Sequence, residues 1–151
     1  KGYIKLLFSS ANAICEIIGH VVFATKNRFP YLETIELRQK VWKHIKANAA
    51  EKGIAVDSVS GYKEHCHCLI SLNSYQSISD VVKLIKGESS FWINKEKLTL
   101  EHFEWQREYY AAAVFESILK ATRNYIFQQE KHHSTINFEN EFLDFREKFK
   151  L

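Results

Sequence analysis

The feature that most constrains the fold is the order in which strand-like and helix-like hydrophobic patterns follow one another. The chain of 151 residues contains only five glycines and one proline. It has no internal repeat and no segment rich in serine, glycine or proline that would separate two units. We therefore expect a single domain over residues 1–151. A domain of this size buries about 68–70% of the surface that its unfolded chain exposes.

Two kinds of pattern alternate along the chain. Predicted strands, rich in β-branched or alternating apolar residues, are Cys15–Thr25, Ile54–Ser60, His65–Leu72 and Phe103–Tyr110. Predicted helices have apolar residues every three or four positions and cover Glu33–Lys52, Val114–His133 and the tail Glu139–Lys150. A further predicted helix begins at a cap, Ser77 or Ser79, and extends to Trp92. The order β-α-β-β-α-β is typical of a ferredoxin-like split βαβ fold. We expect an α+β sandwich: an antiparallel sheet with helices on one face, plus a C-terminal helix that carries a tyrosine.

Composition excludes several classes of protein. The chain is 46% hydrophobic and 26% charged, as in globular proteins. No apolar run is long enough to cross a membrane, and the start of the chain lacks the pattern of a signal peptide. Three cysteines, two of them only two residues apart, argue against a disulfide framework and favour a reducing cytoplasm. The absence of Met, with Lys as first residue, indicates a stretch of a slightly longer chain.

Charge and aromatic content leave the partner open. The net charge, 21 − 18 = +3, is too small to identify a nucleic-acid binder. The aromatic content of 14% is high, but aromatic side chains serve both hydrophobic cores and base stacking.

A pair of histidines lies in the strand predicted over His65–Leu72. Because side chains alternate along a strand, His65 and His67 share one face, while Cys66 and Cys68 face the helices as small hydrophobic residues. Two adjacent imidazoles can share one cation, and Glu64 or a backbone carbonyl can fix their tautomers. The alternative is that both are ordinary surface residues. A structural zinc site is disfavoured, because one ion cannot collect side chains from both faces.

A tyrosine and a glutamine lie four residues apart on the long C-terminal helix. Tyr125 and Gln129 share one helix face. Such a tyrosine usually packs against the core, but together with the histidines it would supply a nucleophile, and Gln129 a third metal ligand. Phosphoryl transfer requires these parts, because a phenol with a pKa near 10 is a poor nucleophile and the phosphodiester is anionic. Imidazole ligands favour Mn²⁺ over Mg²⁺.

With these motifs, the chain resembles the single-tyrosine HUH transposases of the insertion-sequence-200-like group. The resemblance covers nearly the whole length, and its segments keep their order: 20–28 (HVVFATKNR), 64–67 (EHCH), 77–87 (SISDVVKLIKG) with Ser89 and Ser90, 103–106 (FEWQ), Tyr109, and 125–133 (YIFQQEKHH). Two departures stand out. The middle HUH residue is Cys66 rather than a bulky hydrophobe, and residues 107–113 lack the glycines that would ease repositioning of the tyrosine helix.

The resemblance implies an enzyme that cuts and rejoins single-stranded DNA at mobile-element ends with subterminal hairpins, in the cytoplasm of a bacterial or archaeal cell. It implies that Tyr125 attacks the scissile phosphate, leaving a 5′-phosphotyrosine and a free 3′-OH. It implies His65, His67 and Gln129 as ligands of Mg²⁺ or Mn²⁺. It also implies a homodimer in which the tyrosine helix of one subunit can complete the histidine site of the other.

Four basic residues match positions expected near DNA: Lys26 and Arg28 after the first strand, and Lys83 and Lys86 on the second helix. The alternative for each is an ordinary solvated side chain.

Two other functions stay open. One is a replication initiator or relaxase that shares the HUH core. The other is a domesticated hairpin-binding protein that no longer transfers strands.

Overall fold

The computed structural model describes residues 16–133 together with residues 140, 143 and 147. Its sheet has the order β2-β3-β1-β4, and each neighbouring pair is antiparallel. The strands are β1 (Ile17–Ala24), β2 (Ala55–Tyr62), β3 (His65–Leu72) and β4 (Tyr110–Ala113). The predicted tail helix Glu139–Lys150 lies almost wholly outside the described residues.

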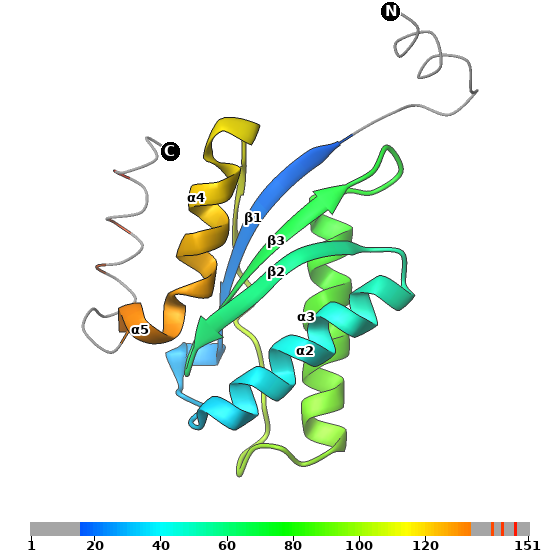
Figure 1. Cartoon of the computed structure of the whole chain (residues 1–151). Helices are drawn as coiled ribbons and strands as arrows, with labels where there is room; N and C mark the ends of the chain where they lie inside the picture. Colours follow the sequence, from blue (N-terminus) through cyan, green and yellow to red (C-terminus); the bar gives the residue numbers. More distant parts are fainter. Residues whose placement is uncertain (1–15, 134–139, 141–142, 144–146, 148–151) are drawn as a thin grey trace, which may run out of the picture.

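Helices cover both faces of this sheet (Figure 1). Helices α2 (Ile35–Glu51) and α3 (Ile78–Lys95) lie on one face. Helices α4 (Glu116–Phe127) and α5 (Gln129–His133) lie on the other. The predicted α+β sandwich with a C-terminal tyrosine-bearing helix is confirmed. Among the described residues, no helix combines the length and the apolar character that a membrane span needs.

The main core fills the space between the sheet and the helices α2 and α3. Cys66 and Cys68 are fully buried in it, as the alternation along β3 predicts. Burial raises the pKa of the Cys66 thiol well above its usual value. The other members come mainly from β1, β3, α2 and α3 and include Val21, Phe23, Ile70, Val41, Ile45, Val81 and Ile85. The cysteines therefore serve as small hydrophobic side chains.

The start of each long helix has a side-chain cap. The Thr34 hydroxyl accepts a hydrogen bond from the backbone N–H of Leu37 at 3.2 Å, and Ser77 accepts one from Asp80 at 3.1 Å. Ser77, of the two predicted serines, is thus the cap of α3. Trp92 on α3 stacks on His44 of α2 with ring centroids 3.7 Å apart, so it serves helix packing.

The hairpin between β2 and β3 places Glu64 beside His65. Strand β2 continues to Tyr62, two residues beyond the predicted end, and leaves Lys63 and Glu64 in the turn. Gly61 permits this close pairing, because a Cβ atom at that position would collide with the carbonyl oxygen of His65.

The strand predicted over Phe103–Tyr110 is wrong in its position. Only Tyr110–Ala113 forms a strand there, and Trp105 makes an isolated bridge to Thr25. The backbone N–H and carbonyl of Phe103 bind the side chain of Asn94, at 2.8 and 2.9 Å. Because this side chain takes the hydrogen bonds that a strand partner would take, Phe103 and Trp105 enter the core from a non-strand segment.

The single helix predicted over Val114–His133 is also wrong. It begins at Glu116 and is interrupted at Gln128, after which α5 follows. The side-chain amide of Gln129 donates to the carbonyl of Tyr125 at 3.3 Å. In a continuous helix, the backbone N–H of Gln129 would donate to this carbonyl instead. The interruption turns Gln129 inward, and its side chain is fully buried.

Candidate metal and tyrosine site

His65 and His67 lie on the face of β3 that α4 and α5 cover. Their exposed fractions are 0% and 3%, so the alternative that they are ordinary surface residues is wrong. Leu69, two positions further along the strand, faces the same side and packs with Ile126 of α4. The alternation of β3 and the C-terminal helices together therefore enclose both imidazoles.

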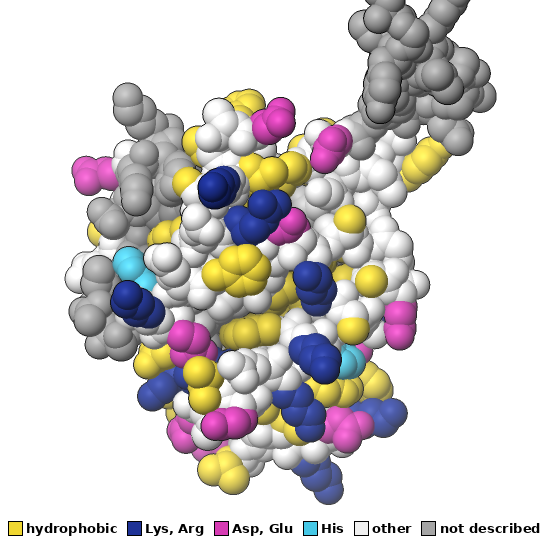
Figure 2. Space-filling view, in the orientation of Figure 1, with side chains coloured by type: hydrophobic (Ala, Val, Ile, Leu, Met, Phe, Trp, Pro, Cys, Tyr) yellow, Lys and Arg dark blue, Asp and Glu magenta, His cyan; other side chains and the backbone are white. Residues whose placement is uncertain are grey.

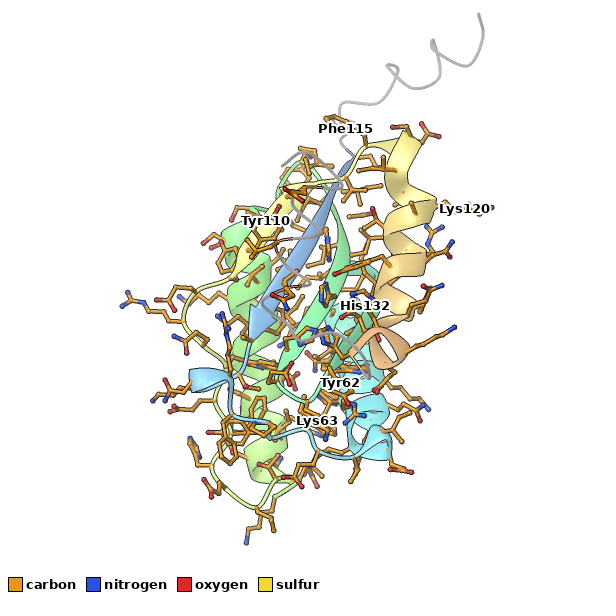
Figure 3. All side chains as sticks on the ribbon, turned by 90° about the vertical axis from the view of Figure 1, so that its left-hand side faces the viewer. Tyr62, Lys63, Tyr110, Phe115, Lys120 and His132 are labelled. Carbon is orange, nitrogen blue, oxygen red and sulfur yellow. The ribbon has the colours of Figure 1, made fainter. Side chains whose placement is uncertain are left out.

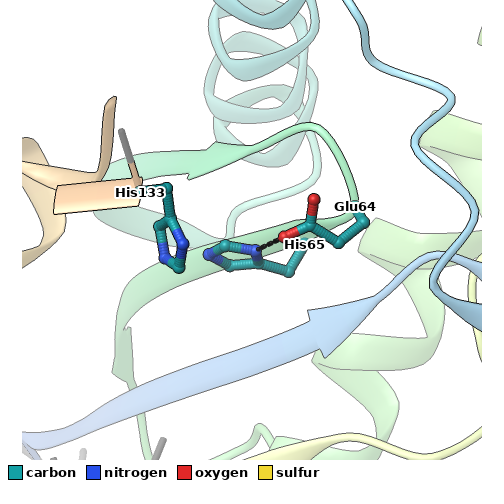
Figure 4. A group of neighbouring side chains, drawn as sticks. All are labelled: Glu64, His65 and His133. Atoms are coloured by element: carbon teal, nitrogen blue, oxygen red, sulfur yellow. Dashed lines mark hydrogen bonds and ion pairs between the residues drawn. The ribbon is translucent and has the colours of Figure 1, made fainter. Parts of the chain in front are cut away.

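The Nδ1 atom of each imidazole is held by a neighbouring side chain. Nδ1 of His65 lies 2.9 Å from Oε1 of Glu64 (Figure 4). Nδ1 of His67 lies 2.9 Å from Nε2 of His20 on β1. If each Nδ1 carries the proton and donates it, Nε2 keeps its lone pair for a metal ion. Burial raises the pKa of Glu64, but the hydrogen bond and charge of His65 outweigh it and lower the pKa overall, which favours an accepting carboxylate.

The C-terminal helices bring Tyr125 and Gln129 to the same place. The Tyr125 ring lies 5.6 Å from the His67 ring and 6.3 Å from the His20 ring, measured between centroids. Oε1 of Gln129 lies 3.0 Å from Nε2 of His65. The four residues singled out in the sequence therefore meet within one chain.

Two ion pairs fix these helices to the rest of the fold. Arg38 of α2, only 4% exposed, donates from Nε and Nη2 to the carboxylate of Glu130 on α5, at 2.5 and 2.8 Å. Arg123 of α4 donates to both carboxylate oxygens of Asp57 on β2, at 2.9 Å each. The hydrogen bond from Arg123 lowers the pKa of the Asp57 carboxyl. Arg123 and Glu130 lie on either side of Tyr125 and Gln129 in sequence, so the two ion pairs hold α4 and α5 against the rest of the same chain.

Three further histidines lie near the site and were not predicted to have a role in it. The His133 ring lies 4.5 Å from that of His65, on the side away from Glu64 (Figure 4). The His132 ring lies 5.8 Å from that of Tyr125. The third is His20. All three stand in segments that carry the family resemblance, but their proximity depends on strand pairing and on the break before α5.

The donor set fits a divalent cation. Candidate ligand atoms of Glu64, His65 and His133 all lie within 4.8 Å of one another. This group shares only His65 with the predicted ligands His65, His67 and Gln129, of which Gln129 places an amide oxygen 3.0 Å from His65. Burial, followed by the charges of His65 and His20, lowers the pKa of His67 well below its usual value. Neutral imidazole is the form that binds metal. Mixed nitrogen and oxygen donors suit Mn²⁺ better than Mg²⁺, which prefers oxygen alone.

The predicted DNA-binding residues divide between two hollows. Lys26, Lys83 and Lys86 border one of about 840 Å³ beside α3. Lys26 pairs with Glu104 at 2.6 Å, and Nζ of Lys86 donates to the carbonyls of Gln106 and Arg107 at 2.6 and 2.9 Å. Burial lowers the pKa of Lys86. Arg28 borders the second hollow, of about 780 Å³, between β1 and β4.

The surface shown in Figure 2 carries no single basic patch. Its Lys and Arg side chains are spread over the surface, with acidic and hydrophobic side chains between them. This distribution agrees with the small net charge of +3.

Comparisons with known proteins agree with this geometry. A family model described as "Transposase IS200 like" matches residues 13–129. The crystal structure of a protein described as a transposase from Deinococcus radiodurans R1 aligns with a TM-score of 0.62 and 20% identity, over 80% of this chain and 96% of that one. A REP-associated tyrosine transposase bound to a REP hairpin aligns with a TM-score of 0.61 and 15% identity, over 85% of this chain and 75% of that one. No curated protein sequence matches this chain at a comparable level.

Proposed function

Because the chain belongs to the family of IS200-like transposases, we propose that it cuts and rejoins single-stranded DNA at the ends of a mobile element, with Tyr125 as nucleophile. The observation that carries this proposal is the meeting of Tyr125 and Gln129 with the two histidines of β3. A tyrosine that served packing alone would not need two buried histidines beside its ring.

The proposed step exchanges one phosphoester for another. The phenolic oxygen of Tyr125 bonds to phosphorus, and the bond between phosphorus and the 3′-oxygen breaks. The DNA is left with a 5′-phosphotyrosine and a free 3′-OH, which takes up a proton in place of the one that the phenol loses. Rejoining reverses these changes with a different 3′-OH. His132, whose ring lies 5.8 Å from that of Tyr125, is the candidate proton acceptor, because both nitrogens of His67 are committed to His20 and to the metal ion.

In this proposal, Nε2 of His65, Nε2 of His67 and Oε1 of Gln129 hold a divalent ion, Mn²⁺ or Mg²⁺. When bound, the ion polarises a non-bridging phosphate oxygen and neutralises developing charge. Glu64 and His20 orient the two imidazoles from behind. Because Gln129 begins α5 only four residues after Tyr125, docking of α5 would align the nucleophile and the ligands together.

The proposed substrate is single-stranded DNA that carries a hairpin. The structural relative bound to a REP hairpin supports this substrate class. Lys26, Lys83, Lys86 and Arg28 are the proposed phosphate contacts, with binding that weakens steeply as salt rises. The chain is proposed to act as a homodimer, as its resemblance to the HUH transposases implies.

A covalent-adduct experiment tests the proposal. The protein is incubated with a library of hairpin-bearing DNA strands that have randomised single-stranded flanks, in Mn²⁺ or Mg²⁺, and separated on a denaturing gel. We expect a protein–DNA adduct that disappears in Tyr125→Phe and in the presence of a chelator. Tyr75→Phe is the matched control, because Tyr75 is 84% exposed, in the loop before α3.

The outcomes separate the competing functions. An adduct that persists in Tyr125→Phe would refute the nucleophile assignment. Hairpin binding without an adduct in the unaltered protein would favour a domesticated binding protein. Nicking of a supercoiled plasmid without strand joining would favour a replication initiator or relaxase.

A further inference from the structure

The hollow between β1, β4 and the short helix η1 (Lys26–Arg28) is the right size for a small ligand group. Its volume is about 780 Å³, and its lining is more apolar than polar. Strand residues supply an apolar floor, and polar groups converge from η1 and the loop before β4. The residues used below are Val22, Ala24 and Tyr110 in the floor, and Asn27, Arg28 and Gln106 around it. Leu143 also borders the hollow.

This floor adjoins the candidate metal site directly. Val22 is the cross-strand partner of His67, and Ala24 is the partner of His65. On the other side of β1, Val22 pairs with Tyr110. Directly opposed side chains have Cβ atoms about 4.5–5.5 Å apart, so the floor begins one strand away from the histidines. Figure 3 shows this face of the sheet, with β4 and Tyr110 on one side, α4 on the other, and β1 and β3 between them.

The polar border is held in an unusual backbone conformation. Asn27 and Arg28 have φ angles of 56° and 54°, in the left-handed region that non-glycine residues seldom adopt. Oε1 of Gln106 accepts the backbone N–H of Asn27 at 3.1 Å, and the Thr25 carbonyl accepts that of Arg28 at 3.0 Å. Strained residues that the surrounding structure holds in place cluster at ligand sites. Here they put an amide and a guanidinium at the border of the hollow.

Resting on the function proposed above, we propose that this hollow binds one unpaired DNA base of the nucleotide next to the scissile phosphate. A base has flat apolar faces and an edge of hydrogen-bond donors and acceptors. The floor with the Tyr110 ring suits the faces, because bases stack on aromatic side chains. The amide of Asn27 suits the edge, since it offers both a donor and an acceptor. Gln106 holds Asn27 in place, because its Oε1 accepts from the backbone N–H of Asn27 and its Nε2 donates to Glu108.

The distance between the two sites favours this occupant. A base is joined to its own phosphate through a single sugar. A phosphate at His65 and His67 would therefore place the attached base near the neighbouring strand β1, and not at the hollow beside α3. Arg28, at the border of the hollow, can contact the next phosphate or stack on the base. The hollow would thus read one position of the cleavage sequence, while hairpin recognition occurs elsewhere.

A binding selection tests the proposal without requiring cleavage. The library of hairpin-bearing strands with randomised flanks is equilibrated with protein in a chelator, and the bound fraction is sequenced. We expect the unaltered protein to select a base at one single-stranded position. Tyr110→Ala and Ala24→Leu, which remove the stacking ring or fill the hollow, should reduce that selection about tenfold and leave the affinity for a hairpin without single-stranded flanks unchanged. Tyr110→Phe should retain it, and Tyr75→Ala is the matched control.

The results also separate failure of the base-binding proposal from failure of the proposed function. Equal base selection in the unaltered protein, Tyr110→Ala and Ala24→Leu would overturn the pocket, as would the absence of any selected base. An abasic nucleotide at the selected position should weaken binding to the unaltered protein and not to Ala24→Leu. If selection depends on the hollow but no Tyr125 adduct forms, the pocket stands and the transposition chemistry fails.

Discussion

At the scale of single residues, the candidate site depends on the orientation of two imidazoles. Glu64 fixes Nδ1 of His65 and His20 fixes Nδ1 of His67, so Nε2 is the nitrogen that each ring would present to a metal ion. Nε2 of His65 lies beside Oε1 of Gln129, the third proposed ligand. Side chains behind metal ligands commonly set affinity by fixing ring orientation and tautomer. His20 therefore acts as a positioning residue.

Replacing His20 tests this orientation. We expect His20→Ala to weaken Mn²⁺ binding about 10- to 100-fold, because His67 loses its Nδ1 partner. His20→Asn, which retains a hydrogen-bonding side chain, should recover part of the affinity. The measurement is Mn²⁺ titration followed by electron paramagnetic resonance, with His102→Ala as control, since His102 is exposed. Equal affinities in His20→Ala and His102→Ala would contradict the positioning role.

Burial of His67 predicts a pH dependence of stability in the metal-free protein. Its pKa in the folded state is far below the value of about 6.5 in an unfolded chain. As pH falls below about 6.5, the unfolded state takes up a proton that the folded state does not, so the free energy of unfolding decreases. The loss is up to about 1.4 kcal/mol per pH unit until the folded pKa is reached.

Urea unfolding with a chelator, between pH 7.5 and 5, measures this loss. His67→Asn should show a shallower pH dependence than the unaltered chain, whatever its absolute stability. Identical slopes for the two proteins would show that His67 is not the group responsible.

At the scale of elements, α4 and α5 are the parts that complete the site. They pack on the sheet through a core of Leu69, Val114 and Ile126, and partly buried hydrophobic side chains extend it: Ile18, Ile118, Leu119 and Tyr125. Two ion pairs add to this attachment. The pair between Arg38 and Glu130 is the more buried of the two, and Arg38 also donates to the carbonyls of Leu32 and Glu33.

We expect Glu130→Gln to destabilise the fold by about 1.5–3 kcal/mol, because the buried Arg38 loses both hydrogen bonds to a charged partner. It should also reduce adduct formation, since Gln129 adjoins Glu130. Urea unfolding gives the first quantity and the denaturing gel the second. The matched control is Glu101→Gln on the exposed loop after α3. A loss no larger than that of the control would mean that the ion pair does not hold α5.

At the scale of the whole molecule, the helix that carries Tyr125 packs on the sheet of its own chain. Arg123 and Glu130, on either side of Tyr125 in sequence, bind residues of β2 and α2. This arrangement completes a site in cis. The homodimer and completion of the site in trans stay predictions of the family resemblance.

Mixing two inactive variants decides between the arrangements. A chain with His67→Ala and a chain with Tyr125→Phe are combined and incubated with the hairpin library. Because the ion pairs dock the tyrosine helix in cis, we expect no adduct above that of either variant alone. An adduct on the His67→Ala chain would demonstrate exchange of tyrosine helices between subunits.

Local patterns in the sequence determined much of this protein. The alternation along residues 64–70 places His65 and His67 opposite Cys66 and Cys68, and the four-residue spacing of Tyr125 and Gln129 places them together. The first follows from the geometry of a single strand. The second was predicted from helical periodicity, although a break at Gln128 separates Tyr125 on α4 from Gln129 on α5. The two wrong predictions of secondary structure lie where a side chain takes a backbone hydrogen bond. The side chain of Asn94 binds the backbone of Phe103, and the side chain of Gln129 binds the carbonyl of Tyr125 at the break between α4 and α5.

Only the tertiary structure decided the surroundings of these residues. His20 meets His67 across 47 positions, Gln129 meets His65 across 64, and Glu130 meets Arg38 across 92. The hollow beside the histidines likewise requires β4 to pair with β1. Such contacts depend on which strands pair and in which register, and periodicity within one segment carries no information on either. The sequence determined which side chains share a face, and the folded sheet decided which faces meet.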